Sequence, residues 1–251
     1  MSRETASRAL VFLAGLAVWE ALARSGLWSP ALLPPPEAVA RYLAGAVRDG
    51  SLAWGAGTSL LRLAIGYSLS VVGGVALGVV VARFRRVSDA LGGVIFGLQT
   101  LPSVCWLPLA ILWFNRGEPA ILFVVVMGAI PTITVATWNA IQQVPPLYVR
   151  AGQTLGARGS SLYLTVVFPA AFPAMLAGFK QGWNFAWRSL MAGELLDVTR
   201  GLGFLLASGR QRNDVAQLFG VMLVIVALGA VVDFVLFRRL ERAVRSRWGF
   251  V

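Results

Sequence analysis

Histidine is absent from this chain of 251 residues, and cysteine and lysine occur once each, as Cys105 and Lys180. Without histidine, the chain cannot form a Ser-His-Asp or Cys-His nucleophilic site, a histidine-ligated metal centre or an imidazole proton relay. One cysteine excludes an intrachain disulfide and a cysteine metal cluster. The lysine is followed by Gln181, so a Walker A loop, which needs Gly-Lys-Ser/Thr, is excluded too. We expect no catalytic residue, no metal and no cofactor bound by this chain.

Charged residues are also scarce. They make up 13% of the chain and apolar residues 57%, whereas about 25% of a soluble domain is charged. Too few polar side chains remain to cover a water-soluble globule, which indicates a protein of the bilayer. The net charge of +11 is almost entirely arginine. The arginines lie at the ends of apolar runs, a placement that the positive-inside rule explains better than nucleic-acid binding does.

Apolar runs long enough to cross a membrane set the fold class. A hydrocarbon core of roughly 30 Å needs about 20 helical residues. The predicted spans are Ala9–Ala23, Thr58–Ala82, Val94–Phe114, Pro119–Ile141, Tyr163–Gly193 and Val215–Phe237. We therefore expect an all-α integral membrane fold with about six transmembrane helices, of which the first is the shortest.

The first span has two interpretations. Arg3 and Arg8 precede the apolar run, and Ala21-Leu22-Ala23 is similar to a signal-peptidase site, so a cleaved signal is one of them. Trp19 and Glu20 favour the other, a retained helix with tryptophan at the membrane interface.

Arginine placement predicts the orientation. With six spans and a cytoplasmic N-terminus, twelve arginines fall on the inner segments and seven on the longer outer ones. Both termini are therefore expected in the cytoplasm. After Leu33-Pro34-Pro35-Pro36, Glu37–Val47 reads as an amphipathic helix at the outer interface. The whole chain, 1–251, is expected to be one membrane domain: residues 1–57 form the first span and this outer segment, and 58–251 a five-span core with a cytoplasmic loop at 144–162.

That loop carries the most specific pattern. Pro145 and Pro146 end the preceding span, Leu147–Leu155 can form a short helix, and Gly156 suits the left-handed residue that ends it. Leu147, Ala151 and Leu155 fall on one face of this helix. Such a helix either docks into a groove on another protein or only turns the chain around.

The loop resembles the cytoplasmic signature of the membrane subunits of bacterial ABC importers, the binding-protein-dependent permeases. The signature is Glu-Ala-Ala, three residues, Gly, nine residues, Ile, one residue and Leu-Pro. The corresponding residues here are Arg150, Ala151, Gly152, Gly156, Val166, Phe168 and Pro169. The spacing is intact, but Arg150 replaces the glutamate and Gly152 the second alanine.

The resemblance covers most of Thr58–Trp248 and is to the nitrate/sulfonate/taurine/bicarbonate branch. It includes LRLAIGYSLSVVGGVALGVVVARFRRV, LQTLP, LPLAILWFNRGEP and WNFAWRSLMAGELLDVTRGLGFLL. It implies a type I importer permease in the bacterial inner membrane, usually a homodimer, that carries a small, anionic solute. A periplasmic or lipid-anchored binding protein would deliver the solute, and two ATPase subunits, holding ATP and Mg, would bind the loop. The coupling residues it implies are Leu147, Arg150, Ala151, Gly152, Leu155, Gly156 and Ala157.

Charges within spans are costly and indicate function. Lys180 and Arg188, eight residues apart, fall on roughly one helix face with Asn184 between them. This polar strip either lines the translocation cavity or packs inside the protein. The pathway candidates are Lys180, Asn184, Trp187, Arg188 and Gln99.

Two further charges lie near the ends of their spans. Arg62 can pair with Glu194 or Asp197 or contact the binding protein, and Asp233 can reach Arg83, Arg238 or lipid headgroups. The candidates for the outer face are Arg62, Glu194 and Arg200. Gly66, Gly73, Gly74 and Gly78 permit close helix approach, either within the chain or at a dimer interface.

Two other functional classes compete with an importer permease. An ATP-independent secondary transporter or channel predicts an inverted repeat or a proton-relay carboxylate deep in a span, and the sequence contains neither. A membrane-embedded enzyme needs a catalytic constellation, and the lack of histidine argues against most of these.

Overall fold

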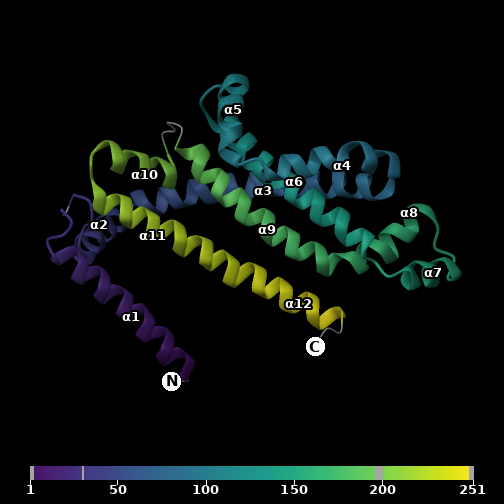
Figure 1. Cartoon of the computed structure of the whole chain (residues 1–251), viewed down its shortest axis with the longest axis horizontal. Coiled ribbons are helices and arrows are strands. Elements are labelled where there is room, and N and C mark those ends of the chain that lie inside the picture. The colour runs from purple at the N-terminus through teal and green to yellow at the C-terminus, as the bar shows by residue number, and fades with distance from the viewer. Residues whose placement is uncertain (1–2, 30, 196–199, 249–251) are drawn as a thin grey trace. The chain divides into compact units, whose positions relative to one another are not determined.

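The structure of the chain is a computed structural model that describes residues 3–29, 31–195 and 200–248. Within these ranges every regular element is a helix (Figure 1). The helices divide into two compact units. Unit 1 comprises Met1–Ser59 with Asp197–Leu228, and unit 2 comprises Leu60–Leu196 with Gly229–Val251.

Four described helices are long and apolar enough to cross a bilayer: Ser51–Arg83, Glu118–Gln142, Gly159–Glu194 and Val215–Val244. Each contains one of the predicted spans. A bent pair of helices adds a fifth span if the pair is counted as one. The predicted sixth, Ala9–Ala23, lies inside α1 (Arg3–Arg24), a helix of 22 residues. Among the described residues, the structure thus has four or five candidate spans, against the predicted number of about six, because α1 is not among the helices that are long and apolar enough to cross a bilayer.

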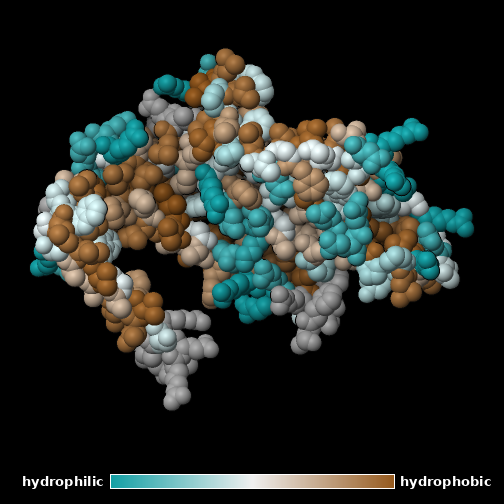
Figure 2. Space-filling model, viewed as in Figure 1, coloured by the Kyte–Doolittle hydropathy of each residue, from teal (hydrophilic) through white to brown (hydrophobic). Residues whose placement is uncertain are grey.

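Unit 1 contains α1, α2 (Pro36–Arg48), the start of α3 (Ser51–Arg83), α10 (Leu202–Gln211) and most of α11 (Val215–Val232). The predicted amphipathic helix is confirmed as α2. Before α3, the Asp49 carboxylate accepts the backbone N–H of Ser51 at 2.8 Å. Hydrogen bonds from Ser51 lower the pKa of Asp49 below its ordinary value. Figure 2 shows hydrophobic surface along α1, where Leu10, Phe12 and Leu13 are exposed.

The core of unit 2 is built around α6 (Glu118–Gln142). Val124, Val125, Ala129 and Ile133 of this helix are fully buried. The helix α9 (Phe168–Glu194) runs beside α6 (Figure 1). A Cβ added at Gly182 of α9 would lie 2.6 Å from Ile133. Small residues therefore bring these two helices close together.

The same device packs α3 on α6. A Cβ at Gly66, Gly74 or Gly78 would fall 2.6–2.8 Å from Val125, Ile133 or Thr137 of α6, respectively. Of the two interpretations of these glycines, the structure supports helix packing within the chain.

The predicted continuous span Val94–Phe114 is wrong. The chain forms α4 (Arg85–Thr100), a short 3-10 helix η1 (Ser103–Trp106) and α5 (Leu107–Phe114), and it bends by 103° between α4 and the η1–α5 pair. The cause is Pro102, which lacks an N–H and disfavours helical backbone at Leu101. Leu101 is accordingly extended, with φ −72° and ψ 121°.

Two other helices contain a wider, π-helical turn. The first of these turns is η2 (Tyr163–Val167), which lies between α8 (Gly159–Leu162) and α9. The second is η3 (Asp233–Phe237), which lies between α11 and α12 (Arg238–Trp248). Pro169 lies two residues after η2. The wider turn leaves space between the proline ring and the preceding turn of the helix. Figure 2 shows hydrophilic surface over α12, which carries exposed Arg239 and Arg242.

Candidate functional site

The predicted loop helix forms as α7 (Pro146–Thr154). Gly156 has φ +90°, the left-handed conformation expected of it. Its N–H donates to the Gln153 carbonyl at 3.0 Å, and the N–H of Ala157 donates to the Gly152 carbonyl at 3.0 Å. These two bonds make a Schellman motif, which satisfies carbonyls at the end of α7 and fixes the exit of the chain.

The predicted coupling residues lie on different sides of α7. Gly152 faces inward, because an added Cβ would meet Leu162 and Val166 at 2.9 and 2.8 Å. Arg150 and Ala151 are exposed, and Ala157 is half-buried. Two further coupling residues, Leu147 at 70% and Leu155 at 88%, are strongly exposed apolar side chains, as is their neighbour Tyr148 at 52%. Figure 2 shows hydrophobic side chains on the surface at the end of unit 2 that carries α7.

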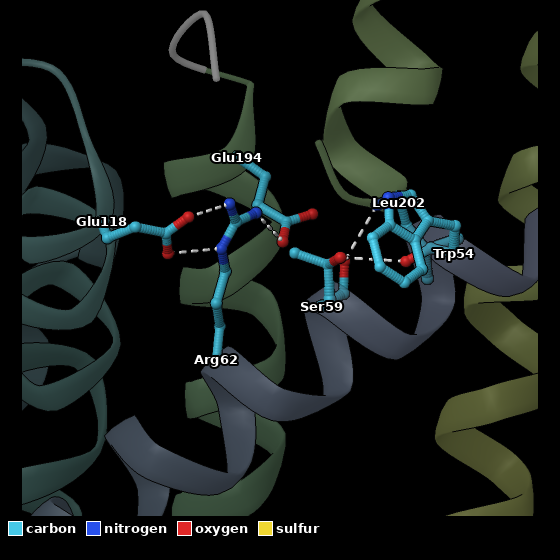
Figure 3. Close-up of polar contacts among 7 residues, drawn as sticks. Trp54, Ser59, Arg62, Glu118, Glu194 and Leu202 are labelled. Carbon is cyan, nitrogen blue, oxygen red and sulfur yellow. Dashed lines mark hydrogen bonds and ion pairs between the residues drawn. The ribbon is translucent and has the colours of Figure 1, made fainter. Parts of the chain in front are cut away.

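Arg62 of α3 pairs with two carboxylates. Its Nη1 donates to Glu194 of α9 at 2.8 Å, its Nε donates to Glu118 of α6 at 2.7 Å, and its Nη2 also pairs with Glu118. Figure 3 shows the guanidinium between the two acids. The Arg62 side chain is 6% exposed and that of Glu194 is 0% exposed. Arg62 therefore connects three helices, and Asp197, the other predicted partner, lies outside the described residues.

Lys180 of α9 also has two acidic partners. Its Nζ lies 3.0 Å from Asp233 and 3.5 Å from Glu241. Asp233 thus pairs with a residue that the sequence had placed in the pathway. Of the predicted alternatives, Arg83 lies over the Tyr163 ring at 4.9 Å and Arg238 over the Phe234 ring at 4.5 Å.

Arg188 and Gln99 line a common cavity of about 310 Å³ in unit 2. The other lining residues are Leu98, Thr100, Leu101, Pro102, Ser103, Val104, Met127, Gly128 and Phe185. Asn184 is exposed on the same face of α9 as Arg188. Trp187 is half-buried, with its indole against Gly229 of α11. The structure thus joins two of the five pathway candidates in one cavity.

The remaining outer-face candidate, Arg200, lies over the Trp54 ring at 5.8 Å. Close by in sequence, the N–H of Leu202 donates to the Ser59 hydroxyl at 2.8 Å, which holds the start of α10 to α3 (Figure 3).

Sequence reasoning missed Glu118 as a partner of Arg62 and Lys180 as the partner of Asp233. Glu118 stands at the start of an apolar span, directly before Pro119, and could have been found by asking which carboxylates begin a span. Among the described residues, no group of three or more histidine, cysteine, aspartate or glutamate side chains is placed to hold a metal ion.

The described part of the chain is all-helical and has several helices long and apolar enough to cross a bilayer, which defines a polytopic membrane protein. The sequence profile of binding-protein-dependent transport system inner membrane components matches residues 74–246. The chain belongs to this family: it is the non-catalytic, multi-pass permease subunit of an ABC importer of the inner membrane. Permeases of such importers work with an ATPase and a binding protein.

Relatives agree with this assignment. The taurine transport system permease protein TauC of Escherichia coli is 30% identical over 77% of this chain and 72% of its own length. The nitrate import permease protein NrtB of Synechocystis sp. is 30% identical over 70% of this chain and 64% of its own length. Among solved structures, a chain of the inward-facing MetNI methionine ABC transporter has a TM-score of 0.68 at 19% identity, covering 78% of this chain and 97% of that one. That likeness concerns the fold.

Proposed function

We propose that two copies of this chain form the translocation pathway for a small solute with an anionic group, and that α7 of each copy docks on an ATPase subunit. The observation that carries the proposal is the exposed apolar surface of α7, formed by Leu147, Tyr148 and Leu155. Nitrate and taurine are named for two relatives, and bicarbonate for CmpB of Synechococcus elongatus, which is 27% identical over 74% of this chain. Each of these solutes carries an oxyanion.

The shape of α7 supports docking. Exposed apolar area costs about 25 cal/mol per Å² in water, so three such side chains on a helix outside the spans favour a protein partner. Gly152 packs on Leu162 and Val166, which holds the helix against the end of a spanning helix. A force applied to α7 would therefore pass directly into the helix that continues as α9. This is the coupling that an ATP-driven importer needs.

The exposed polar strip of α9 supports a pathway between two copies. Gln181, Asn184 and Arg188 follow one another at intervals of three and four residues and are all exposed. Polar side chains within a span are unfavourable against lipid. We assign this strip to the water-filled pathway, where a second copy would face it. The binding protein would deliver the solute on the outer side of the membrane, to which the arginine distribution assigns Arg62, Glu194 and Arg200.

The arginine distribution supports the orientation. It places both termini and α7 on the cytoplasmic side, where an ATPase is available, and α2 on the outer side.

The test is a pull-down of the tagged protein from detergent-solubilised membranes, with Ala151→Arg and Gly156→Asp compared with wild type. Ala151 is exposed beside the apolar surface, and Gly156→Asp strains a left-handed position at the end of α7. We expect a polypeptide with a Walker A motif to copurify with the wild type and to be lost, by at least about tenfold, from both variants.

The matched control is Ala44→Arg, which adds the same charge at an exposed alanine of α2. It should retain the ATPase. Native mass spectrometry of the wild-type complex should give two copies of this chain and two of the ATPase. An ATPase that is retained by both α7 variants would overturn the docking role, and a single permease copy would overturn the dimer.

A further inference from the structure

We propose that the cavity beside Arg188 binds the anionic group of the transported solute, with the Arg188 guanidinium as its cation. This inference rests on the proposed function, because it places a solute site on the pathway. It also selects Arg188 over Lys180, the other basic residue of the same helix.

The three basic residues that lie within the spans predicted from the sequence differ in their partners. Arg62 is paired with Glu118 and Glu194, and Lys180 with Asp233 and Glu241. Arg188 is exposed and has no ion pair with any residue that the structure describes. A cation within a span is costly unless an opposite charge or water accompanies it. Arg188 therefore keeps a charge that a bound anion can neutralise.

The cavity has the chemistry of an anion site. Among the residues that the structure describes, the lining includes one cation, Arg188, three polar side chains, Gln99, Thr100 and Ser103, and no carboxylate. The amide of Gln99 and the hydroxyl of Ser103 can both donate hydrogen bonds. A planar guanidinium binds carboxylate-like and phosphate-like oxygens through two parallel N–H groups, and nitrate, bicarbonate and a sulfonate all offer such oxygens.

The size of the cavity fits a small solute. Its volume is about 310 Å³, at the lower end of the roughly 300–1,000 Å³ of small-molecule sites. Since a water molecule takes about 30 Å³, a small oxyanion fits together with several waters.

The bent helix pair supplies a second, independent argument. Leu101 and Pro102 are non-helical and exposed, and they lie between α4 and η1 in a pair that only together has the length of a span. Non-helical backbone at membrane depth is tolerated only where protein buries it or where it lines a water-filled cavity. Discontinuous helices also build the substrate sites of many transporters. The break and Arg188 line the same cavity, which marks it as the aqueous part of the pathway.

The test uses a reporter thiol in the cavity. Ser103→Cys is made in a Cys105→Ala background, and the ATPase-bound complex is placed in nanodiscs. The rates of modification by an anionic reagent, methanethiosulfonate ethylsulfonate, and by its cationic trimethylammonium counterpart are measured with Arg188 intact, with Arg188→Gln and with Arg188→Lys. We expect the anionic-to-cationic rate ratio to fall about tenfold in Arg188→Gln, because the local positive potential is lost. Arg188→Lys should keep most of the anionic-to-cationic rate ratio of the protein with Arg188 intact.

The control is Lys180→Gln, which removes the same charge from the same helix but away from this cavity. It should change the ratio less than about twofold, since eight helical residues, or about 12 Å, separate Lys180 from Arg188, which exceeds the Debye length of about 8–10 Å at physiological ionic strength. Nitrate, bicarbonate or taurine, compared with gluconate at equal ionic strength, should slow modification of the Arg188 protein by at least about threefold and leave the Arg188→Gln protein unchanged.

The result that would overturn the site is an unchanged ratio in Arg188→Gln, or no protection by any of the three solutes. Copurification of the ATPase with Arg188→Gln is recorded in parallel. If the ATPase is retained while the ratio stays unchanged, the anion site alone fails. If no ATPase binds even the wild-type chain, the proposed function fails first.

Discussion

The buried Arg62–Glu194 pair shows how single charges are accommodated in this chain. An isolated buried charge is strongly unfavourable, and a pair is tolerated only when its geometry satisfies both partners. Arg62 donates to both of its carboxylates, and Glu194 is fully buried. Removal of the arginine would leave Glu194 buried without its cation.

We therefore predict that Arg62→Met lowers the free energy of unfolding by about 3–5 kcal/mol, as expected for breaking a buried pair by removing one partner. Glu118→Gln should cost less, because that side chain is 60% exposed. Thermal unfolding in detergent, followed by loss of the monodisperse protein, measures both.

Arg41→Met is the control, because the Arg41–Glu37 pair of α2 is exposed, at 76% and 68%. Exposed pairs are worth about 0–1 kcal/mol. Equal losses in Arg62→Met and Arg41→Met would contradict the structural role of Arg62.

At the scale of single residues, the sequence identified the charged side chains within spans but only some of their partners. It included Glu194 among the partners of Arg62 because both residues lie near the same end of their spans. It missed the Lys180–Asp233 pair because the facing of two helices depends on their rotation about their own axes, which the spacing of charges does not reveal.

Helix packing in unit 2 depends on glycines that are indistinguishable in sequence from glycines that pack on nothing. A Cβ at Gly78 would lie 2.6 Å from the Cβ of Thr137 and 2.8 Å from the Thr134 carbonyl oxygen. A backbone atom cannot move aside as a flexible side chain can. In contrast, a Cβ at Gly57 of the same helix meets nothing within 4 Å.

We predict that Gly78→Ala destabilises the protein by about 1–3 kcal/mol, the range for overpacking. Gly57→Ala should be neutral or stabilising by up to about 1 kcal/mol, since alanine is the better helix former. The midpoint of thermal unfolding in detergent distinguishes the two. A Gly78→Ala protein as stable as Gly57→Ala would mean that α3 and α6 are not in close contact.

The predicted helices were correct where a long apolar run forms one helix. They were wrong where a single proline breaks the run. Pro131 and Pro173 lie inside α6 and α9, yet Pro102 ends α4. All three stand in apolar runs. The outcome depends on whether neighbouring helices continue to pack on both sides of the proline, and that is a property of the tertiary structure. The short helix α7, bounded by Pro145 and Gly156, was predictable because local chemistry determines both of its ends.

In the whole molecule, we propose α7 as the contact through which ATP-driven closure reaches the membrane helices. Composition alone indicated the bilayer, and the spacing from Gly156 to Pro169 indicated the family. The sequence of one chain does not determine where its partner subunits bind. The contact between α7 and the ATPase therefore needs a direct measurement.

That measurement is site-specific photo-crosslinking in intact cells, with a photoreactive phenylalanine analogue at position 155 and, as control, at position 44 of α2. Leu155 is the most exposed of the apolar α7 side chains. We predict a light-dependent product from position 155 that contains this chain and a Walker-motif ATPase, and no such product from position 44. An ATPase that crosslinks to position 44, or that copurifies with the chain without crosslinking to position 155, would contradict the account.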